Sequence, residues 1–177
     1  ALVSEEGKIL AVQEKAYPLY KPQPLYVEQD PKDYWDAVCE VTRGVLANSG
    51  AVPEDVKALS FSVQAVNIIP VDKDGNVLHN AISWLDGRAE KQAEEINKRC
   101  GMELVRSQDH QSRLLWIKEN RPDIYEKTAY FLDCNSFLQY KATGVMAVEH
   151  DHPGIAKKDP IIQAYIDATY ADIDAAK

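Results

Sequence analysis

The 177 residues carry a net charge of −8 and are 45% hydrophobic, which allows one domain with a real core. The acidic balance excludes nucleic acid or an anionic membrane as the main partner, because both require basic patches. No run approaches the ~18 apolar residues of a membrane span, the chain does not open with a signal peptide, and its three cysteines are far apart. We therefore expect a cytoplasmic protein with reduced thiols.

The chain opens with a predicted hairpin. Residues 1–4 resemble the end of a strand, residues 5–8 form a turn, and residues 9–14 return as a second strand. A hairpin that begins in mid-strand predicts that a segment upstream is missing. An unpaired edge at Leu2 and Val3 would invite association, so a homodimer is one expectation.

The first helix is predicted from Asp30, which can cap it, and Pro31, which suits its first position, to Gly50 as its C-terminal cap. A second helix is predicted from Asp86 as its cap to Gly101. The remaining helices are predicted over residues 114–119, from Pro122, over residues 135–143, and over the last residues, where Ile162, Tyr165, Ile166 and Thr169 are spaced for a helix.

Further strands are predicted over residues 57–63, 67–71, 77–79, 81–84 and 130–132, with a hairpin turn at residues 72–76. Strands and helices thus alternate after the opening hairpin. This order predicts an α/β domain with a mixed sheet and flanking helices.

Two clusters have residue types that bind metals. Residues 72–76 (DKDGN) resemble the start of a calcium loop, but the sixth and twelfth positions hold Val77 and Ser83 instead of Gly and Glu, which favours a hairpin turn. His150 and His152 would share a face of a strand and could bind zinc, although no further ligand stands at a recognised spacing. We favour a solvated loop there, keep zinc as the alternative, and predict no metal site.

The chain contains no glycine-rich phosphate loop and no nucleophile motif. Cys134 stands at a predicted helix start, which could lower the pKa of its thiol. A structural thiol is the favoured interpretation.

Two places where strands end carry the most informative polar residues. Gln64 lies at the first, and Trp84, Asp86 and Arg88 lie at the second. Ligands of α/β sheets bind beyond the carboxyl ends of strands, and an apolar plate beside donors and acceptors suits a polyhydroxylated ligand. The alternative is structural: Trp84 in the core, Asp86 as a cap, and Arg88 as its ion-pair partner. The residues alone leave both interpretations open.

Several motifs resemble, in order, the N-terminal domain of the FGGY family of carbohydrate kinases, xylulokinase-like members especially. They are "EEGKIL" with "YPLY", "LYVEQDPKDYW", "SFSVQAVNIIPVDKDGNVLHNAISWLDGRA", "RLLWIKENRPDIYEK" and "FLDCNSFLQYKATG". They run from about Val3 to Gly144. The resemblance implies an actin-like, ribonuclease-H-like fold and transfer of the γ-phosphoryl group of ATP to a sugar or polyol hydroxyl, with Mg as the metal of the complete enzyme.

The resemblance also assigns site residues. Gln64, Ala65 and Val66 match the family's sugar-contacting Gln-Met-His segment, and Trp84, Asp86 and Arg88 match its Trp-x-Asp-x-Arg tip. Gln108 falls where some relatives have a substrate-contacting Tyr. Ala65 and Val66 depart from Met-His, which leaves xylulose open as the substrate.

The family's phosphate loop should lie just before Ala1, and its nucleotide-binding domain and catalytic Asp far downstream. We therefore expect residues 1–150 to be a sugar-side domain lacking its first strand and phosphate loop, and residues 151–177 to be a helical tail. This chain alone should have no catalytic residue, no bound cofactor and no turnover. The alternative is a stand-alone, non-catalytic sugar-binding or regulatory module of the same fold.

Overall fold

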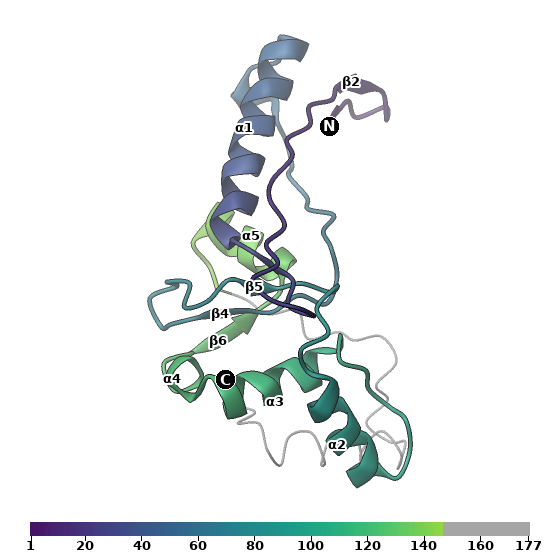
Figure 1. Cartoon of the computed structure of the whole chain (residues 1–177). Coiled ribbons are helices and arrows are strands. Elements are labelled where there is room, and N and C mark those ends of the chain that lie inside the picture. The colour runs from purple at the N-terminus through teal and green to yellow at the C-terminus, as the bar shows by residue number, and fades with distance from the viewer. Residues whose placement is uncertain (147–177) are drawn as a thin grey trace, which may run out of the picture.

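The computed structural model describes residues 1–146, which form three layers (Figure 1). The central layer contains strands β4 (Ile69–Val71) and β6 (Tyr130–Leu132). On one side lie the long helix α1 (Pro31–Ser49) and helix α5 (Cys134–Thr143). On the other side lie three helices: α2 (Glu90–Cys100), α3 (His110–Asn120) and α4 (Pro122–Tyr125).

Helix boundaries follow from local capping. The Asp30 side chain accepts a hydrogen bond from the Lys32 backbone N–H at the start of α1, and Asp133 does the same for Ser136 at the start of α5. Helices α1, α2 and α5 each end at a glycine in the left-handed conformation, at Gly50, Gly101 and Gly144. These ends agree with the sequence-based predictions.

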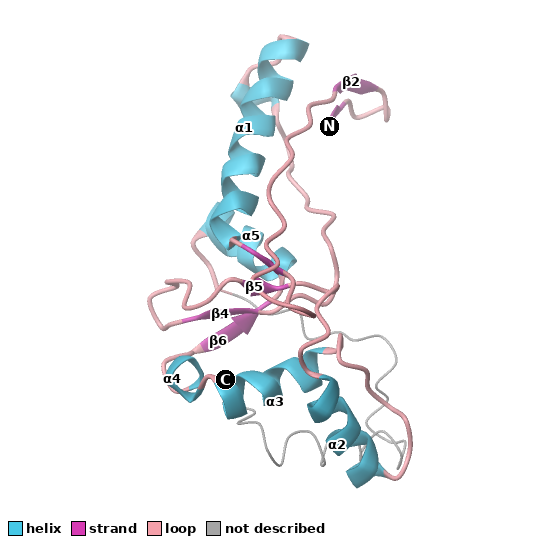
Figure 2. Ribbon diagram, in the orientation of Figure 1, coloured by secondary structure: helices cyan, strands magenta, loops and turns pink. Residues whose placement is uncertain are grey.

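The described strands pair as three antiparallel, two-stranded ladders, shown in magenta in Figure 2. Strand β4 pairs with β6, with Ile69 opposite Leu132. The other ladders join β1 (Leu2–Val3) to β2 (Ile9–Ala11) and β3 (Glu28–Gln29) to β5 (Ala81–Ile82). A bridge between Ile68 and Ile82 connects the β3–β5 ladder to the β4–β6 ladder.

The core lies on both faces of these central strands. Towards α1 and α5 it contains Tyr34, Ile69, Val71, Ala81, Leu132, Cys134, Phe137 and Leu138. Towards α3 and α4 it contains Ile68, Ile82, Ala89, Trp116, Ile117, Ile124 and Tyr125. Burial on two faces explains why these short strands are apolar throughout.

Four local predictions differ from the structure. Residues 77–79 form no strand, and Val77 makes only a single bridge, to Val71. Residues 57–63 run as a loop rather than a strand (Figure 2), because no neighbouring strand in the described part of the chain receives their backbone hydrogen bonds. Asp86 does not cap α2, which begins at Glu90, because its carboxylate bonds to other groups. Helix α3 begins at His110, four residues before the predicted start.

The turn at residues 72–76 is confirmed. The Asp72 carboxylate accepts hydrogen bonds from the backbone N–H groups of Asp74 and Asn76, each at 2.9 Å. At the top of Figure 1, the β1–β2 hairpin exposes Val3, Ile9, Leu10 and Val12 beside α1. Association through this hairpin stays a prediction. The zinc alternative at His150 and His152 and the predicted terminal helix lie outside the described residues.

Candidate functional site

The first part of the site is segment A, which we define as residues 62–67. Within it Gln64 is half-buried, Ala65 is exposed and Val66 is half-buried. Val66 has φ = +59°, a left-handed conformation that is unusual for a β-branched residue and costs about 1–3 kcal/mol. The surrounding structure must therefore hold segment A in place.

Side chains from α1 and β3 hold Gln64. Its Nε2 lies 2.7 Å from Gln29 Oε1 and 3.1 Å from Tyr34 Oη, and Tyr34 Oη lies 2.9 Å from Gln29 Oε1. Burial raises the pKa of Tyr34, so its hydroxyl is protonated at neutral pH. Tyr34 and Gln29 are both buried, which removes competing water from these hydrogen bonds.

Asn67 closes the end of segment A. Its side-chain oxygen accepts a hydrogen bond from the Cys134 backbone N–H at 3.0 Å, and its Nδ2 lies 3.4 Å from Tyr34 Oη. The Cys134 thiol is buried, and burial raises its pKa to about 11. A thiol that is protonated and buried agrees with the structural interpretation of Cys134 rather than with a nucleophile.

The second part of the site is segment B, which we define as residues 82–88. Trp84 is about half exposed (49%), and Leu85 beside it is equally open. Trp84 therefore is not a core residue and presents an apolar surface to solvent. The structural interpretation considered from the sequence is wrong for this residue.

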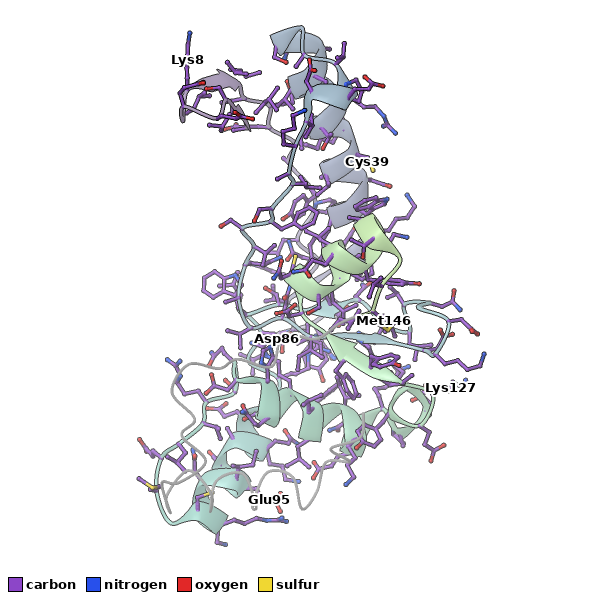
Figure 3. All side chains as sticks on the ribbon, turned by 180° about the vertical axis from the view of Figure 1, so that it is seen from behind. Lys8, Cys39, Asp86, Glu95, Lys127 and Met146 are labelled. Carbon is purple, nitrogen blue, oxygen red and sulfur yellow. The ribbon has the colours of Figure 1, made fainter. Side chains whose placement is uncertain are left out.

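Asp86 and Arg88, the polar members of segment B, are both buried. Figure 3 labels Asp86. Arg88 Nε and Nη2 donate to the two carboxylate oxygens of Asp86 at 2.9 and 2.8 Å, and Nη2 also donates to Glu28 at 2.7 Å. Asp86 further accepts a hydrogen bond from the Val27 backbone N–H at 2.6 Å. These contacts tie segment B to β3.

Aromatic rings complete the surroundings of Arg88. Its guanidinium carbon lies 3.9 Å from the centre of the Tyr26 ring and 4.9 Å from that of Trp116. Such cation–π contacts stabilise a buried cation. Because Arg88 donates to the carboxylates of Asp86 and Glu28, it holds segment B in place.

Arg113 of α3 connects segments A and B. Its Nη1 donates to the backbone carbonyl of Val66 and, at 3.4 Å, to that of Ile82. The side chain is fully buried, and this desolvation lowers its pKa to about 10, which still leaves it charged at neutral pH. Arg113 is not among the residues predicted for the site. The signal for it in the sequence is a cation directly before an apolar run of α3, Leu114 to Ile117.

The last predicted site residue, Gln108, is half-buried in the turn that precedes α3. It therefore precedes Arg113, which lies in α3, by five residues. Gln29, Tyr34 and Asn67 are also site-supporting residues to which the sequence analysis gave no role, although the first two lie in the quoted motif "VEQDPKDY".

Within residues 1–146, no group of three Asp, Glu, His or Cys side chains could hold a metal ion. Over the same residues, no helix is both long and apolar enough to cross a membrane.

The chain was compared with known proteins. Residues 1–156 match the N-terminal domain of the FGGY family of carbohydrate kinases. Among curated relatives, a human FGGY carbohydrate kinase domain-containing protein is 34% identical over 162 residues, and xylulose kinase of Bacillus subtilis is 30% identical over 156 residues. These matches cover 83% and 84% of this chain but only 29% and 31% of the relatives.

The fold has counterparts among solved structures. Xylulose kinase from Rhodospirillum rubrum superposes with a TM-score of 0.72 at 22% identity, over 83% of this chain and 32% of that one. The expected fold class, a ribonuclease-H-like α/β domain of the actin-like type, is thereby confirmed.

Proposed function

This chain belongs to the FGGY family of carbohydrate kinases, and on that premise we propose that it forms the sugar-side part of an enzyme that transfers the γ-phosphoryl group of ATP to a hydroxyl of a sugar or polyol. We assign residues 1–150 to this part, followed by a tail at residues 151–177 and a separate nucleotide-binding domain. The matches cover only 31% and 29% of two relatives, which supports the separate nucleotide-binding domain.

The observation that carries the proposal is the position of Arg113. Its guanidinium bonds to the backbone of Val66, two residues after Gln64, and of Ile82, two residues before Trp84. A single buried side chain thus holds together the two segments that offer an amide and an exposed aromatic ring. An aromatic plate beside a polar group is an arrangement that suits a carbohydrate, which has an apolar face and hydroxyl edges.

Each predicted site residue receives a role on this basis. Trp84 packs against the apolar face of the sugar, while Gln64 and Gln108 bind hydroxyls. Ala65 and Val66 offer only apolar contact, so the sugar is held with fewer polar contacts here than a Met-His pair would give. Asp86 and Arg88 position segment B, because their polar atoms bond to each other and to Glu28.

The cofactors belong elsewhere in this proposal. Phosphoryl transfer depends on positioning and on neutralising the charge of the phosphates. Residues 1–146 supply a sugar-positioning surface, with segments A and B joined by Arg113. In this proposal ATP, its Mg²⁺ and the base that deprotonates the sugar hydroxyl are held by other parts of the complete enzyme.

The test is ADP release by the complete protein that contains this chain, over a panel of ketoses, aldoses and polyols that includes D-xylulose and glycerol. We expect ATP-dependent phosphorylation of at least one of them. Trp84→Ala should raise the KM for that sugar at least about tenfold, the equivalent of 1.4 kcal/mol of lost binding. Tyr130→Ala is the matched control, since Tyr130 is an aromatic residue of similar exposure on β6.

Two results would contradict the kinase proposal. One is no ADP release above background with any sugar of the panel. The other is micromolar binding of a sugar by this chain alone without turnover of the complete protein, which would instead support the stand-alone binding module.

A further inference from the structure

Two neighbouring turns place apolar side chains in solvent. Residues 23–26 form one turn and residues 83–86 the other, and each is closed by a backbone hydrogen bond from its last residue to its first. The Gly87 N–H donates to the Leu25 carbonyl at 2.9 Å, which joins the two turns. Turns usually carry Gly, Asn, Asp or Ser. Here the central positions include three residues that are 64%, 49% and 47% exposed, which we call the apolar patch: Leu25, Trp84 and Leu85.

Leu25 has a backbone conformation that does not suit leucine. Its φ is +68°, and within residues 1–146 Val66 of segment A is the only other non-glycine residue with a positive φ. Leu25 follows Pro24 as the third residue of its turn. A turn with proline second and a left-handed third residue normally has Gly or Asn at that third position. Leucine is strained there because its Cβ crowds the backbone, whereas glycine is not.

The packing of the fold does not account for this strained leucine. The Leu25 side chain is 64% exposed, and it reaches segment B only from outside, over the backbone of Gly87. Strained residues cluster at ligand sites. We infer that Leu25 is a specificity-determining residue, which together with Trp84 and Leu85 selects a sugar that has a carbon without a hydroxyl, as in a deoxy sugar. The inference rests on the proposed function, in which Trp84 contacts the sugar.

The chemistry of the apolar patch favours a deoxy carbon. A hydroxyl pressed against leucine loses its water without gaining a hydrogen bond, which costs free energy. A methyl or methylene group in the same place loses no hydrogen bond and gains from burial. Ala65, the exposed residue of segment A, adds no polar side chain either. The remaining hydroxyls of such a sugar are left to Gln64 and Gln108.

The binding test uses the complete protein without ATP. Isothermal titration calorimetry gives the Kd of the panel sugar that binds best, and of analogues in which one hydroxyl at a time is replaced by hydrogen. We expect one position at which the deoxy analogue binds at least about threefold more tightly than the parent sugar, as for one buried methylene. Equal or weaker binding of every deoxy analogue would overturn the inference, and so would a lack of measurable binding by all of them.

A matched pair of variants assigns the preference to Leu25. Leu25→Asn keeps the turn, because asparagine tolerates the left-handed conformation, and it places an amide where the leucine stood. It should abolish the preference for the deoxy analogue. Leu59→Asn is the control, since Leu59 is 62% exposed and lies outside segments A and B, and it should leave the preference unchanged. An unchanged preference in Leu25→Asn would overturn the inference.

Further readouts separate this inference from the kinase proposal and from other roles of Leu25. Because binding is measured without ATP, the preference supports the inference even if no sugar is phosphorylated, a result that would contradict the kinase proposal alone. Leu25→Gly relieves the strain and should leave the urea midpoint unchanged or raise it, whereas Leu59→Gly should lower it. A lower midpoint in Leu25→Gly would assign Leu25 to the fold and overturn the inference. So would a changed mass of Leu25→Asn in light scattering with the sugar preference unaltered, which would make the apolar patch a contact between copies of the protein.

Discussion

The guanidinium of Arg88 and the carboxylate of Asp86 form a bidentate pair, with contacts of 2.9 and 2.8 Å, although neither side chain reaches solvent. Breaking a buried pair leaves one charge without its partner, which typically costs about 3–5 kcal/mol. We therefore expect Asp86→Ala to lower the free energy of unfolding by about 3 kcal/mol or more, as measured by urea titration.

Two further variants test this account of the pair. Asp86→Ala combined with Arg88→Met should cost less than the sum of the two single changes, because the interaction between these two side chains can be lost only once. Lys73→Ala, which breaks an exposed pair with Asp74, should change stability by less than about 1 kcal/mol. Additive single effects would contradict the coupling.

Tyr140 of α5 packs against the turn at residues 72–76. Gly75 has φ = +79°, and a Cβ added to it would collide with the hydroxyl and ring of Tyr140. Gly101 has a similar φ of +70° with open space around it. Gly101→Ala should therefore cost only the left-handed conformation, about 1–2 kcal/mol, whereas Gly75→Ala should cost at least about 1 kcal/mol more.

The same urea titration measures both glycine variants. Removing the Tyr140 ring by Tyr140→Ala should bring the cost of Gly75→Ala close to that of Gly101→Ala. If Gly75→Ala and Gly101→Ala lower the free energy of unfolding equally while Tyr140 is present, Tyr140 does not restrict the space around Gly75.

Some parts of the fold could be predicted from local signals in the sequence, and others could not. Asp30, Pro31 and Gly50 are local signals, so the boundaries of α1 were predictable. The prediction of a strand over residues 57–63 was wrong, since a strand exists only where a neighbour receives its hydrogen bonds. Tyr140 and Gly75 meet across 65 residues of chain, and no local pattern indicates such a contact.

The residues of the candidate site were likewise only partly predictable from local patterns in the sequence. Gln64 and Trp84 could be proposed because polar and aromatic residues at strand ends are a local pattern. Asp86 and Arg88 have residue types that suit either a ligand or each other, and only their burial distinguishes the two. The bonds of Gln64 to Gln29 and Tyr34 join residues 35 and 30 positions apart, so no local pattern indicates them.

Cys134 provides a prediction about pH. Burial raises the pKa of its thiol from 9.0 to about 11, and only the thiolate reacts with alkylating agents. At pH 8 this shift alone should make Cys134 about a hundredfold slower to react with iodoacetamide in the folded chain than in urea, since each pKa unit is a factor of ten. Peptide mass spectrometry after timed alkylation measures this ratio.

The raised pKa also affects stability. Between pH 9 and 11 the folded state keeps the Cys134 proton that the unfolded state releases, so stability should fall as the pH rises through this range. Cys134→Ala should make that fall shallower. Fast alkylation of Cys134 at pH 8 under native conditions would contradict its burial.

The contribution of Arg113 to the site can be measured separately from its contribution to the stability of the fold. Its Nη1 bonds to the carbonyls of Val66 and Ile82, whereas its buried Nε and Nη2 have no partner among the residues that the structure describes. Arg113→Met removes both the bonds and the desolvated charge, two effects that oppose each other in the free energy of unfolding. We expect stability to change by less than about 1 kcal/mol, while the KM for the sugar rises about tenfold because segments A and B are no longer joined.

Steady-state kinetics and urea titration of the complete protein measure the two quantities side by side. Arg113→Lys should recover part of the sugar affinity, since an ammonium can reach one carbonyl but lacks the planar fork of a guanidinium. Lys118→Met removes a second cation of α3, which lies over the Tyr125 ring, and it should leave the KM unchanged. An unchanged KM for the sugar in Arg113→Met, accompanied by a loss of stability, would assign Arg113 to the fold alone.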